Sequence, residues 1–245
     1  MKQSDFTVRE NVRIAEKTWR MCLEGDTSPF VRGGQFIDLR LDGRFLRRPF
    51  AVQKWDSESL TLIYKTVGEG TREMTGIRPG TVIDALTGLG NGFDADASKQ
   101  AALVVCGGLG ASPAFTLVKD LLAGGRTVTV ILGFNTAAEA ILYEDYCALG
   151  ADTRLVTVDG SAGLKGLVTD ALAQLNPVFD YFYTCGPKVM MKAVCGAIDG
   201  PGEVSLEERM GCGCGICYGC TCHTVKGPAR VCADGPVFKK EDVIW

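Results

Sequence analysis

Six of the eleven cysteines lie in one short glycine-rich stretch near the carboxyl end, and this cluster constrains the chain more than any other feature. Four of them, Cys212, Cys217, Cys220 and Cys232, follow the spacing C-x4-C-x2-C with a distant fourth cysteine. That spacing is the ligand pattern of plant-type 2Fe-2S clusters. The glycines between them let the backbone fold tightly and direct N–H groups at the sulfurs. The spacing therefore predicts a 2Fe-2S site with these four ligands.

Two other metal assignments compete with this one. A 4Fe-4S register that starts at Cys214 would need a further cysteine at the position that Thr224 occupies. A zinc site is the alternative, because C-x2-C pairs are common in zinc ribbons and Cys222 and His223 add potential ligands. A ribbon usually has two spaced pairs, so we favour the cluster. We expect Cys214 and Cys222 to be packing residues and His223 to be a surface imidazole.

Composition excludes several classes of protein. The net charge is −3 and no run of lysine and arginine stands out, so nothing supplies the basic face that nucleic-acid binding requires. The longest apolar run, residues 101–106, is far shorter than the roughly 20 residues that span a bilayer. The first residues lack the apolar stretch of a signal peptide. We therefore expect a soluble cytoplasmic protein with no nucleic-acid or membrane partner, whose cysteines ligate metal rather than form disulfides.

The hydrophobic pattern divides the chain into three segments. Residues 1–95 contain short alternating runs, such as 7–14 and 59–67, separated by turn residues, which predicts an antiparallel β-barrel. Residues 96–200 alternate buried parallel strands with helices, which predicts a doubly wound parallel-sheet α/β domain. Its strands are expected at 102–106, 127–132, 153–158 and 181–184, and its helices at 113–123, 137–149 and 163–175. Residues 201–245 form a small C-terminal cluster domain.

Two glycine-containing strand ends predict a dinucleotide site in the α/β domain. The first strand runs into a turn with Gly107, Gly108 and Gly110, where the backbone can approach a pyrophosphate and a helix that starts near Pro113 can offer its N–H groups. The last strand runs into Cys185, Gly186 and Pro187. A ligand at the topological switch point would contact this loop and the loop after the first strand. Cys185 could face the nicotinamide. The alternative role for Cys185 is that of a buried thiol that only packs in the core.

These features together resemble the ferredoxin-NADP reductase superfamily. The resemblance rests on Arg48-Pro49-Phe50 in the barrel, the Gly-Gly-Leu-Gly-Ala-Ser-Pro turn and the Cys-Gly-Pro strand end. Residues 208–220 and 231–238, together with Asp159-Gly160-Ser161, narrow it to the electron-transfer subunits of class 1B dihydroorotate dehydrogenase. The likeness covers nearly the whole chain, with its motifs in the family's order.

The resemblance implies FAD on the barrel, NAD on the α/β domain and a catalytic partner subunit that carries FMN, in a heterotetramer of two of each chain. The chain would pass electrons from the partner's oxidation of dihydroorotate, in pyrimidine biosynthesis, through the 2Fe-2S cluster and FAD to NAD. By the same resemblance the FAD site comprises Arg48, Pro49, Phe50, Ala51, Ile63, Tyr64, Lys65, Gly70 and Thr71. An arginine can pair with a flavin phosphate, and a glycine allows close backbone approach.

One departure and two rival functions accompany this interpretation. Position 51 is Ala where the family motif ends in Ser, so a hydroxyl contact to the flavin is missing and its potential or affinity should differ. NAD is expected rather than NADP, because the strand at 127–132 leads into Gly133-Phe134-Asn135-Thr136 with no arginine for a 2′-phosphate. The rivals are a ferredoxin-linked NAD(P)H oxidoreductase subunit and a zinc-containing binding module without redox activity.

Overall fold

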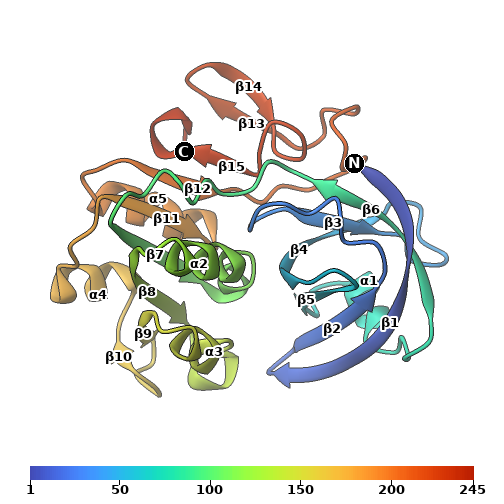
Figure 1. The fold of residues 1–245 in the computed structure, drawn as a ribbon, viewed down its shortest axis with the longest axis horizontal. Coiled ribbons are helices and arrows are strands. Elements are labelled where there is room, and N and C mark those ends of the chain that lie inside the picture. The colour runs from blue at the N-terminus through green and yellow to red at the C-terminus, as the bar shows by residue number, and fades with distance from the viewer.

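Alternating apolar residues close the first segment into a six-stranded barrel. The computed structural model describes residues 1–245, and its first six strands pair in the order β1-β2-β5-β4-β3-β6, with every pair antiparallel (Figure 1). Side chains at alternate positions, such as Phe6, Val8, Met21 and Leu23, point inward and are fully buried. The predicted antiparallel barrel is confirmed. Its elements are β1 (Lys2–Ala15), β2 (Thr18–Glu24), β3 (Phe36–Leu39), β4 (Arg48–Trp55), β5 (Ser59–Lys65), α1 (Glu69–Met74) and β6 (Val82–Leu89).

The second half of the chain forms a seven-stranded sheet in the order β10-β9-β8-β7-β11-β12-β15, parallel except for β15. Two layers of helices cover it (Figure 1). The chain winds outward from β7 to β10 and then returns to the other side at β11, so the switch point lies between β7 and β11. The predicted doubly wound domain is confirmed. Its elements are β7 (Ala101–Gly107), η1 (Gly108–Ala111), α2 (Ala114–Ala123), β8 (Thr127–Phe134), η2 (Ala137–Glu139), α3 (Tyr143–Ala148), β9 (Asp152–Thr157), β10 (Leu164–Lys165), α4 (Val168–Leu175), β11 (Tyr181–Cys185) and α5 (Lys188–Ala197).

Two of the predicted helices are shorter than expected. The helix expected at 137–149 divides into η2 and α3, because Leu142 adopts a left-handed conformation with φ of 62° that interrupts the helical hydrogen bonds. The helix expected at 163–175 begins only at Val168, after the short edge strand β10. Neither break has a proline to announce it, so the periodicity of apolar residues extended both helices too far.

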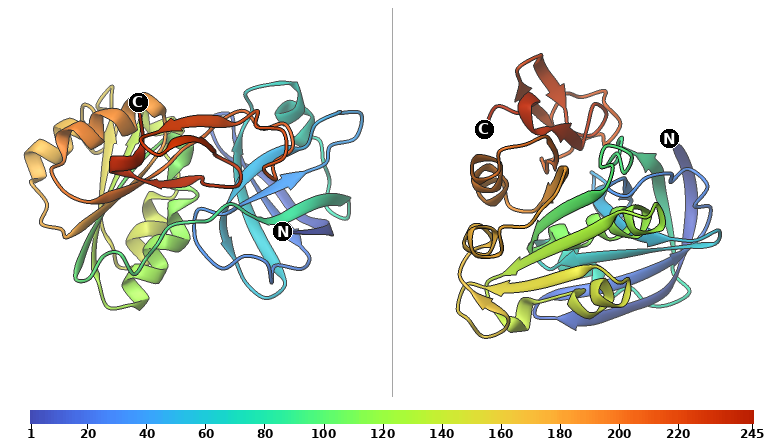
Figure 2. Two further views of the ribbon diagram at one scale, coloured as in Figure 1. Left: turned by 90° about the horizontal axis from the view of Figure 1, so that it is seen from above. Right: turned by 60° about the vertical axis from the view of Figure 1, so that its left-hand side comes forward.

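The last segment both extends the sheet and carries the cysteines. Strands β12 (Gly202–Ser205) and β15 (Val237–Lys239) join the sheet beyond β11, while β13 (Thr221–Thr224) and β14 (Gly227–Arg230) form a hairpin above it (Figure 2); η3 (Lys240–Asp242) follows. Cys220 and Cys232 belong to the same hydrophobic cluster as Met191 and Val194 of α5. The cysteine-rich loops are therefore anchored on the core of the nucleotide domain. None of the helices is long and apolar enough to cross a membrane.

A linker with specific polar contacts joins the barrel to the sheet. Asn91 donates its side-chain N–H to the Val237 carbonyl at 2.8 Å and accepts the Val237 N–H at 3.1 Å. The Asp94 N–H donates to Glu203 Oε2 at 3.0 Å, and the Tyr183 hydroxyl donates to the Asp94 carbonyl at 2.8 Å. These bonds fix the linker to β11, β12 and β15, and thereby fix the barrel relative to the sheet.

Glu203 should make the stability of this junction depend on pH. The side chain is only 8% exposed, and burial raises its pKa from 4.5 to about 7 despite the Asp94 N–H. The folded state therefore holds the proton more tightly than the unfolded state, and stability falls as pH rises from about 4.5 through about 7. Glu203→Gln keeps the acceptor and should gain up to about 3 kcal/mol at about pH 8, with little change near pH 4. Melting temperatures at both pH values test this, and a loss of stability at pH 8 would contradict it.

Candidate functional site

A cavity of about 400 Å³ lies between the barrel and the α/β domain. Its barrel side is formed by the ends of β4 and β5, where the two strands run antiparallel. The residues predicted to hold FAD converge here, and we therefore call this the flavin cavity. Its lining includes Arg48, Pro49, Phe50, Ala51, Ile63, Tyr64, Lys65 and Thr71. The Tyr64 hydroxyl donates to Asn11 Oδ1 at 2.9 Å inside the barrel, and burial raises its pKa to about 12. Tyr64 is therefore a neutral wall residue rather than an acid.

Arg48 lies at the mouth of this cavity beside the start of α1. Its Nη1 donates to the Leu46 carbonyl at 2.7 Å and to the Arg47 carbonyl at 3.1 Å, and its Nε and Nη2 donate to no protein acceptor. Gly70 does not line the cavity, but a Cβ there would lie 3.1 Å from Arg48 Nε. Gly70 therefore leaves room for the guanidinium, and its backbone approach to the cofactor stays a prediction. A guanidinium with free N–H groups in a cavity wall suits a phosphate.

Sequence reasoning missed the part of this cavity that comes from the C-terminal segment. Glu207 and Met210 come after β12 and close the cavity from the side of the sheet. The lining on this side also includes Ser205, Leu206, Glu208 and Pro236. Met210 lies only two residues before Cys212, so the flavin cavity and the cysteine loop are joined directly along the chain. The sequence signal that could have found these residues is their position, because they follow the carboxyl end of a strand beside the switch point.

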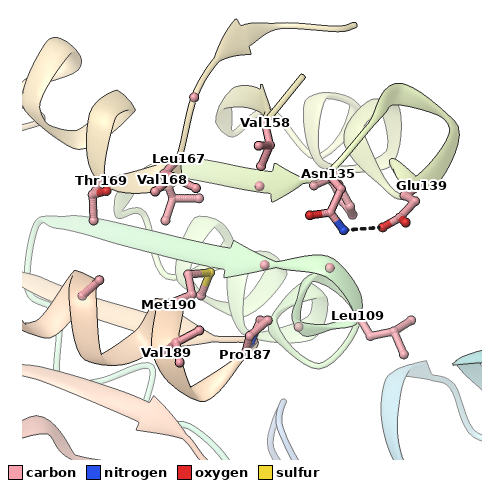
Figure 3. Close-up of a pocket in the computed structure, with 18 of the residues that line it drawn as sticks. Leu109, Asn135, Glu139, Val158, Leu167, Val168, Thr169, Pro187, Val189 and Met190 are labelled. Atoms are coloured by element: carbon pink, nitrogen blue, oxygen red, sulfur yellow. Dashed lines mark hydrogen bonds between the residues drawn. The ribbon is translucent and has the colours of Figure 1, made fainter. Parts of the chain in front are cut away.

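A second cavity, of about 650 Å³, opens along the carboxyl ends of β7, β8 and β11 (Figure 3). All five glycine and proline residues predicted for the dinucleotide line this second cavity, which we therefore call the dinucleotide cavity. They are Gly107, Gly108, Gly110, Gly186 and Pro187. Its far end is bounded by Val158 and by the start of α4 at Val168 and Thr169. Asn135 donates to Glu139 Oε2 at 3.1 Å on one wall, and Glu139 also pairs with Lys65 of the barrel at 3.2 Å. A volume of about 650 Å³ lies within the range of small-molecule and cofactor pockets.

The two predicted loops meet at the switch point because their glycines lack side chains. Cys185 and Cys106 are directly paired on adjacent parallel strands, which brings the loops after them together. A Cβ on Gly110 would overlap the Cys185 carbonyl oxygen. Gly110 therefore serves loop-to-loop packing in addition to the backbone approach that the sequence predicted.

The two cavities share three lining residues, Lys65, Leu109 and Glu207. The Glu207 side chain is exposed to solvent. The protein atoms on the walls around it remove part of its hydration, and this desolvation raises its pKa. Cys185 is 1% exposed and lines the flavin cavity rather than the dinucleotide cavity, and burial raises its pKa well above the ordinary value. Its thiol is therefore neutral and lies in the wall of the flavin cavity.

The four predicted cluster ligands lie together in two pairs. Cys212 and Cys217 lie next to each other, and so do Cys220 and Cys232, because the backbone N–H of the later cysteine in each pair donates to the sulfur of the earlier one. Backbone N–H groups surround the sulfurs: Gly215 donates to Cys232 Sγ at 3.1 Å and Ile216 donates to Cys212 Sγ at 3.2 Å. Further N–H donors are those of Cys217 to Cys212 Sγ, Gly219 to Cys217 Sγ and Cys232 to Cys220 Sγ, each at 3.4 Å.

This arrangement fits a two-iron cluster better than a single metal ion. A zinc ion takes all of its protein ligands on one centre. A 2Fe-2S cluster instead takes two cysteines at each iron, which is the grouping observed. Burial raises the pKa of Cys212, but the N–H groups of Cys217, Cys214 and Ile216 outweigh it and lower that pKa to about 6, which favours a thiolate ligand.

The other residues of the cysteine tail take the places expected for them, with one qualification. Cys222 is buried in the core and His223 is exposed on β13. The Cys214 thiol, predicted to be a packing residue, contacts Cys212. Geometry therefore leaves Cys214 beside the cluster loop, and only the spacing sets it apart from the ligands.

Comparisons with known proteins agree with this geometry. Residues 207–244 match the family described as the iron-sulfur cluster binding domain of dihydroorotate dehydrogenase B. A protein of Fusobacterium nucleatum named "Dihydroorotate dehydrogenase B (NAD(+)), electron transfer subunit" is 44% identical over 257 aligned positions, which cover 99% of each chain. A protein of the same name from Bacillus pumilus is 41% identical and covers 99% of this chain and 98% of its own length.

Solved structures support the fold. A chain of an NADH-dependent reduced ferredoxin-NADP oxidoreductase superposes with a TM-score of 0.90 at 30% identity, covering 98% of this chain and 90% of the other. A ferredoxin NADP+ reductase from Neisseria gonorrhoeae with bound FAD and NADP superposes with a TM-score of 0.68 at 18% identity, covering 80% of this chain and 90% of the other. The second likeness concerns the arrangement of barrel and sheet alone.

Proposed function

Because the chain belongs to the family of dihydroorotate dehydrogenase B electron-transfer subunits, we propose that it passes electrons from a dihydroorotate-oxidising subunit to NAD, in pyrimidine biosynthesis. It is an NAD-dependent oxidoreductase subunit whose cofactors are FAD and an iron-sulfur cluster. A bound flavin exchanges a hydride with a nicotinamide and single electrons with a cluster, which is the chemistry that this relay needs.

One observation carries the proposal: the three candidate sites adjoin one another in a fixed order. The dinucleotide cavity meets the flavin cavity at Lys65, Leu109 and Glu207. The flavin cavity meets the cysteine loop at Met210, two residues before Cys212. A zinc-binding module without redox activity would have no use for this continuity.

Each site residue has a stated task in this proposal. Arg48 and Thr71 hold the FAD phosphates, and β4 and β5 support the flavin through Pro49, Phe50, Ala51, Ile63, Tyr64 and Lys65. Gly70 leaves space for Arg48. The dinucleotide lies on Gly107, Gly108, Gly110, Gly186 and Pro187. Cys185 would face the nicotinamide from the wall of the flavin cavity, and Cys212, Cys217, Cys220 and Cys232 would hold the 2Fe-2S cluster. The corresponding segments are 1–95 for FAD, 96–200 for NAD and 201–245 for the cluster.

The name of the relatives implies a catalytic partner subunit. We propose that this partner carries FMN, that it covers the loop around Cys217, and that two copies of each chain assemble as a heterotetramer. Two apolar side chains on this loop, Ile216 and Tyr218, are 79% and 62% exposed. Exposed apolar side chains next to a redox centre suit a docking surface for the subunit that supplies the electrons.

A ferredoxin-linked function is the second candidate, because the NADH-dependent reduced ferredoxin-NADP oxidoreductase chain is similar over nearly the whole length. The higher identity of the named dihydroorotate dehydrogenase relatives, 44% against 30%, favours the first function.

The experiment that tests the function combines spectroscopy with reconstitution. The purified chain should show a flavin and a cluster spectrum, and NADH should bleach the flavin faster than NADPH does under anaerobic conditions, because no arginine follows β8 to pair with a 2′-phosphate. Co-expression with an FMN-containing dihydroorotate dehydrogenase should give one complex on size exclusion, in which dihydroorotate reduces NAD.

Three results would contradict separate parts of this proposal. Equal or faster reduction by NADPH would overturn the NAD preference. Separate elution of the two chains at micromolar concentration would overturn the partner. Efficient ferredoxin reduction by the isolated chain, without any dihydroorotate-dependent activity in the co-expressed pair, would favour the ferredoxin-linked function instead.

A further inference from the structure

Asp38 is a buried carboxylate of the barrel that the electron-transfer function has not yet used. It lies on β3, where its backbone pairs with Pro49 on one side and Leu86 on the other. Its side chain is 2% exposed, and Oδ1 has no hydrogen-bond partner. Buried carboxylates without a partner are costly and need an explanation.

The Asp38 side chain points at the cysteine loop. A Cβ on Gly213, which has φ of +65°, would overlap Asp38 Oδ2, so the carboxylate touches the backbone between Cys212 and Cys214. The Asp38 carboxylate also interacts electrostatically with the Cys212 sulfur. A residue of the FAD-binding barrel thus reaches the ligand loop of a different segment.

Two positive charges, Arg47 and Arg48, lie near Asp38, and neither donates to its carboxylate; Arg48 donates to the Leu46 and Arg47 carbonyls. Arg47 interacts with the Asp38 carboxylate, but its guanidinium donates to the Asp84 carbonyl at 3.1 Å and forms an ion pair with the Asp84 side chain. Arg47 Nη1 reaches only the backbone carbonyl of Asp38, at 3.5 Å. The Asp38 carboxylate is therefore only partly compensated on the side that faces the cysteine loop.

We propose that Asp38 is a positioning residue for the cluster, which fixes the ligand loop at Gly213 and lowers the cluster's reduction potential through its negative charge. The inference rests on the proposed function. A negative charge close to the cluster opposes the addition of an electron, and the effect is large because water is excluded. A cluster of lower potential donates more readily to the flavin, which favours flow toward NAD.

The test compares Asp38→Asn with wild type in the full-length chain loaded with FAD and cluster, at about pH 8. Asparagine keeps the size of the side chain and removes the charge. We expect the ratio of reduced to oxidised cluster at a fixed ambient potential to rise about tenfold, an upward shift of about 59 mV. An EPR-monitored redox titration measures it, and the absorbance of the flavin gives the FAD potential, which should move less. Asp42→Asn, an exposed acid on the loop after β3, is the matched control and should not shift the cluster.

The outcomes separate this inference from the proposed function. A wild-type chain without a cluster signal or without reduction by NADH would contradict the function itself. A normal wild type with an unchanged or lowered cluster potential in Asp38→Asn would overturn the role of Asp38. If Asp38→Asn assembles no cluster, Asp38→Ser should show the same upward shift. Loss of the cluster in both variants would mean that the carboxyl is needed only for folding, and would also overturn the proposal.

Discussion

Serine in place of Cys212, Cys217, Cys220 or Cys232, one at a time, should remove most of the EPR signal of the reduced cluster. A serine oxygen is a harder and more basic ligand than a thiolate and is poorly matched to a sulfide cluster. The grouping into Cys212 with Cys217 and Cys220 with Cys232 means that each change affects one iron directly. FAD should remain bound, because its cavity is formed mainly by the barrel.

Two cysteines that lie outside the ligand spacing provide matched controls. Cys222→Ser changes a core residue and Cys214→Ser changes a thiol that contacts Cys212, yet both should keep nearly the full signal. Cys214 is the sharper control, because it lies on the same loop as Cys212 and Cys217 and differs from them only in falling outside the C-x4-C-x2-C spacing. Should Cys214→Ser abolish the signal while Cys212→Ser retains it, the plant-type assignment would be wrong.

Alanine at Gly110 should slow the reduction of the flavin by NADH about a hundredfold. The added Cβ overlaps the Cys185 carbonyl oxygen, so the loop after β7 and the loop after β11 must move apart by a large fraction of an ångström or more. A displacement of about 1 Å at a reacting centre costs about that factor in rate. Overpacking should also destabilise the fold by about 1–3 kcal/mol.

Stopped-flow absorbance under anaerobic conditions measures this rate. Gly196→Ala is the matched control, because it lies in α5 with open space where the new methyl group would go. It should reduce at the wild-type rate and melt at the same or a slightly higher temperature. The cluster EPR signal should be unchanged in both variants. Wild-type kinetics in Gly110→Ala would show that the two loops do not together form the dinucleotide site.

Features set by short stretches of chain could be predicted from the sequence. The barrel and the doubly wound sheet follow from the period of apolar residues, and both are confirmed by the strand order. The ends of the helices were harder to predict. Leu142 adopts a left-handed conformation that no glycine or proline announces, so the predicted helix at 137–149 ran through it.

Features that depend on distant segments were missed. The sequence places Met210 only within a motif and does not single out Glu207, yet both close the flavin cavity where the C-terminal segment folds back along β12. Cys185 lines the flavin cavity and not the dinucleotide cavity, and its place at the nicotinamide stays a prediction. Which face receives a given ligand depends on the neighbouring segments.

The sequence by itself determined the spacing of Cys212, Cys217, Cys220 and Cys232, the glycines of the two loops and the order of the three segments, because each is written within a few consecutive residues or a simple period. Only the tertiary structure decided that Asp38 of the barrel touches Gly213, that Glu207 stands between two cavities, and that the cysteines form two pairs. Those contacts join residues far apart in the chain, and their geometry is set by how the barrel, the sheet and the cysteine loops pack against one another.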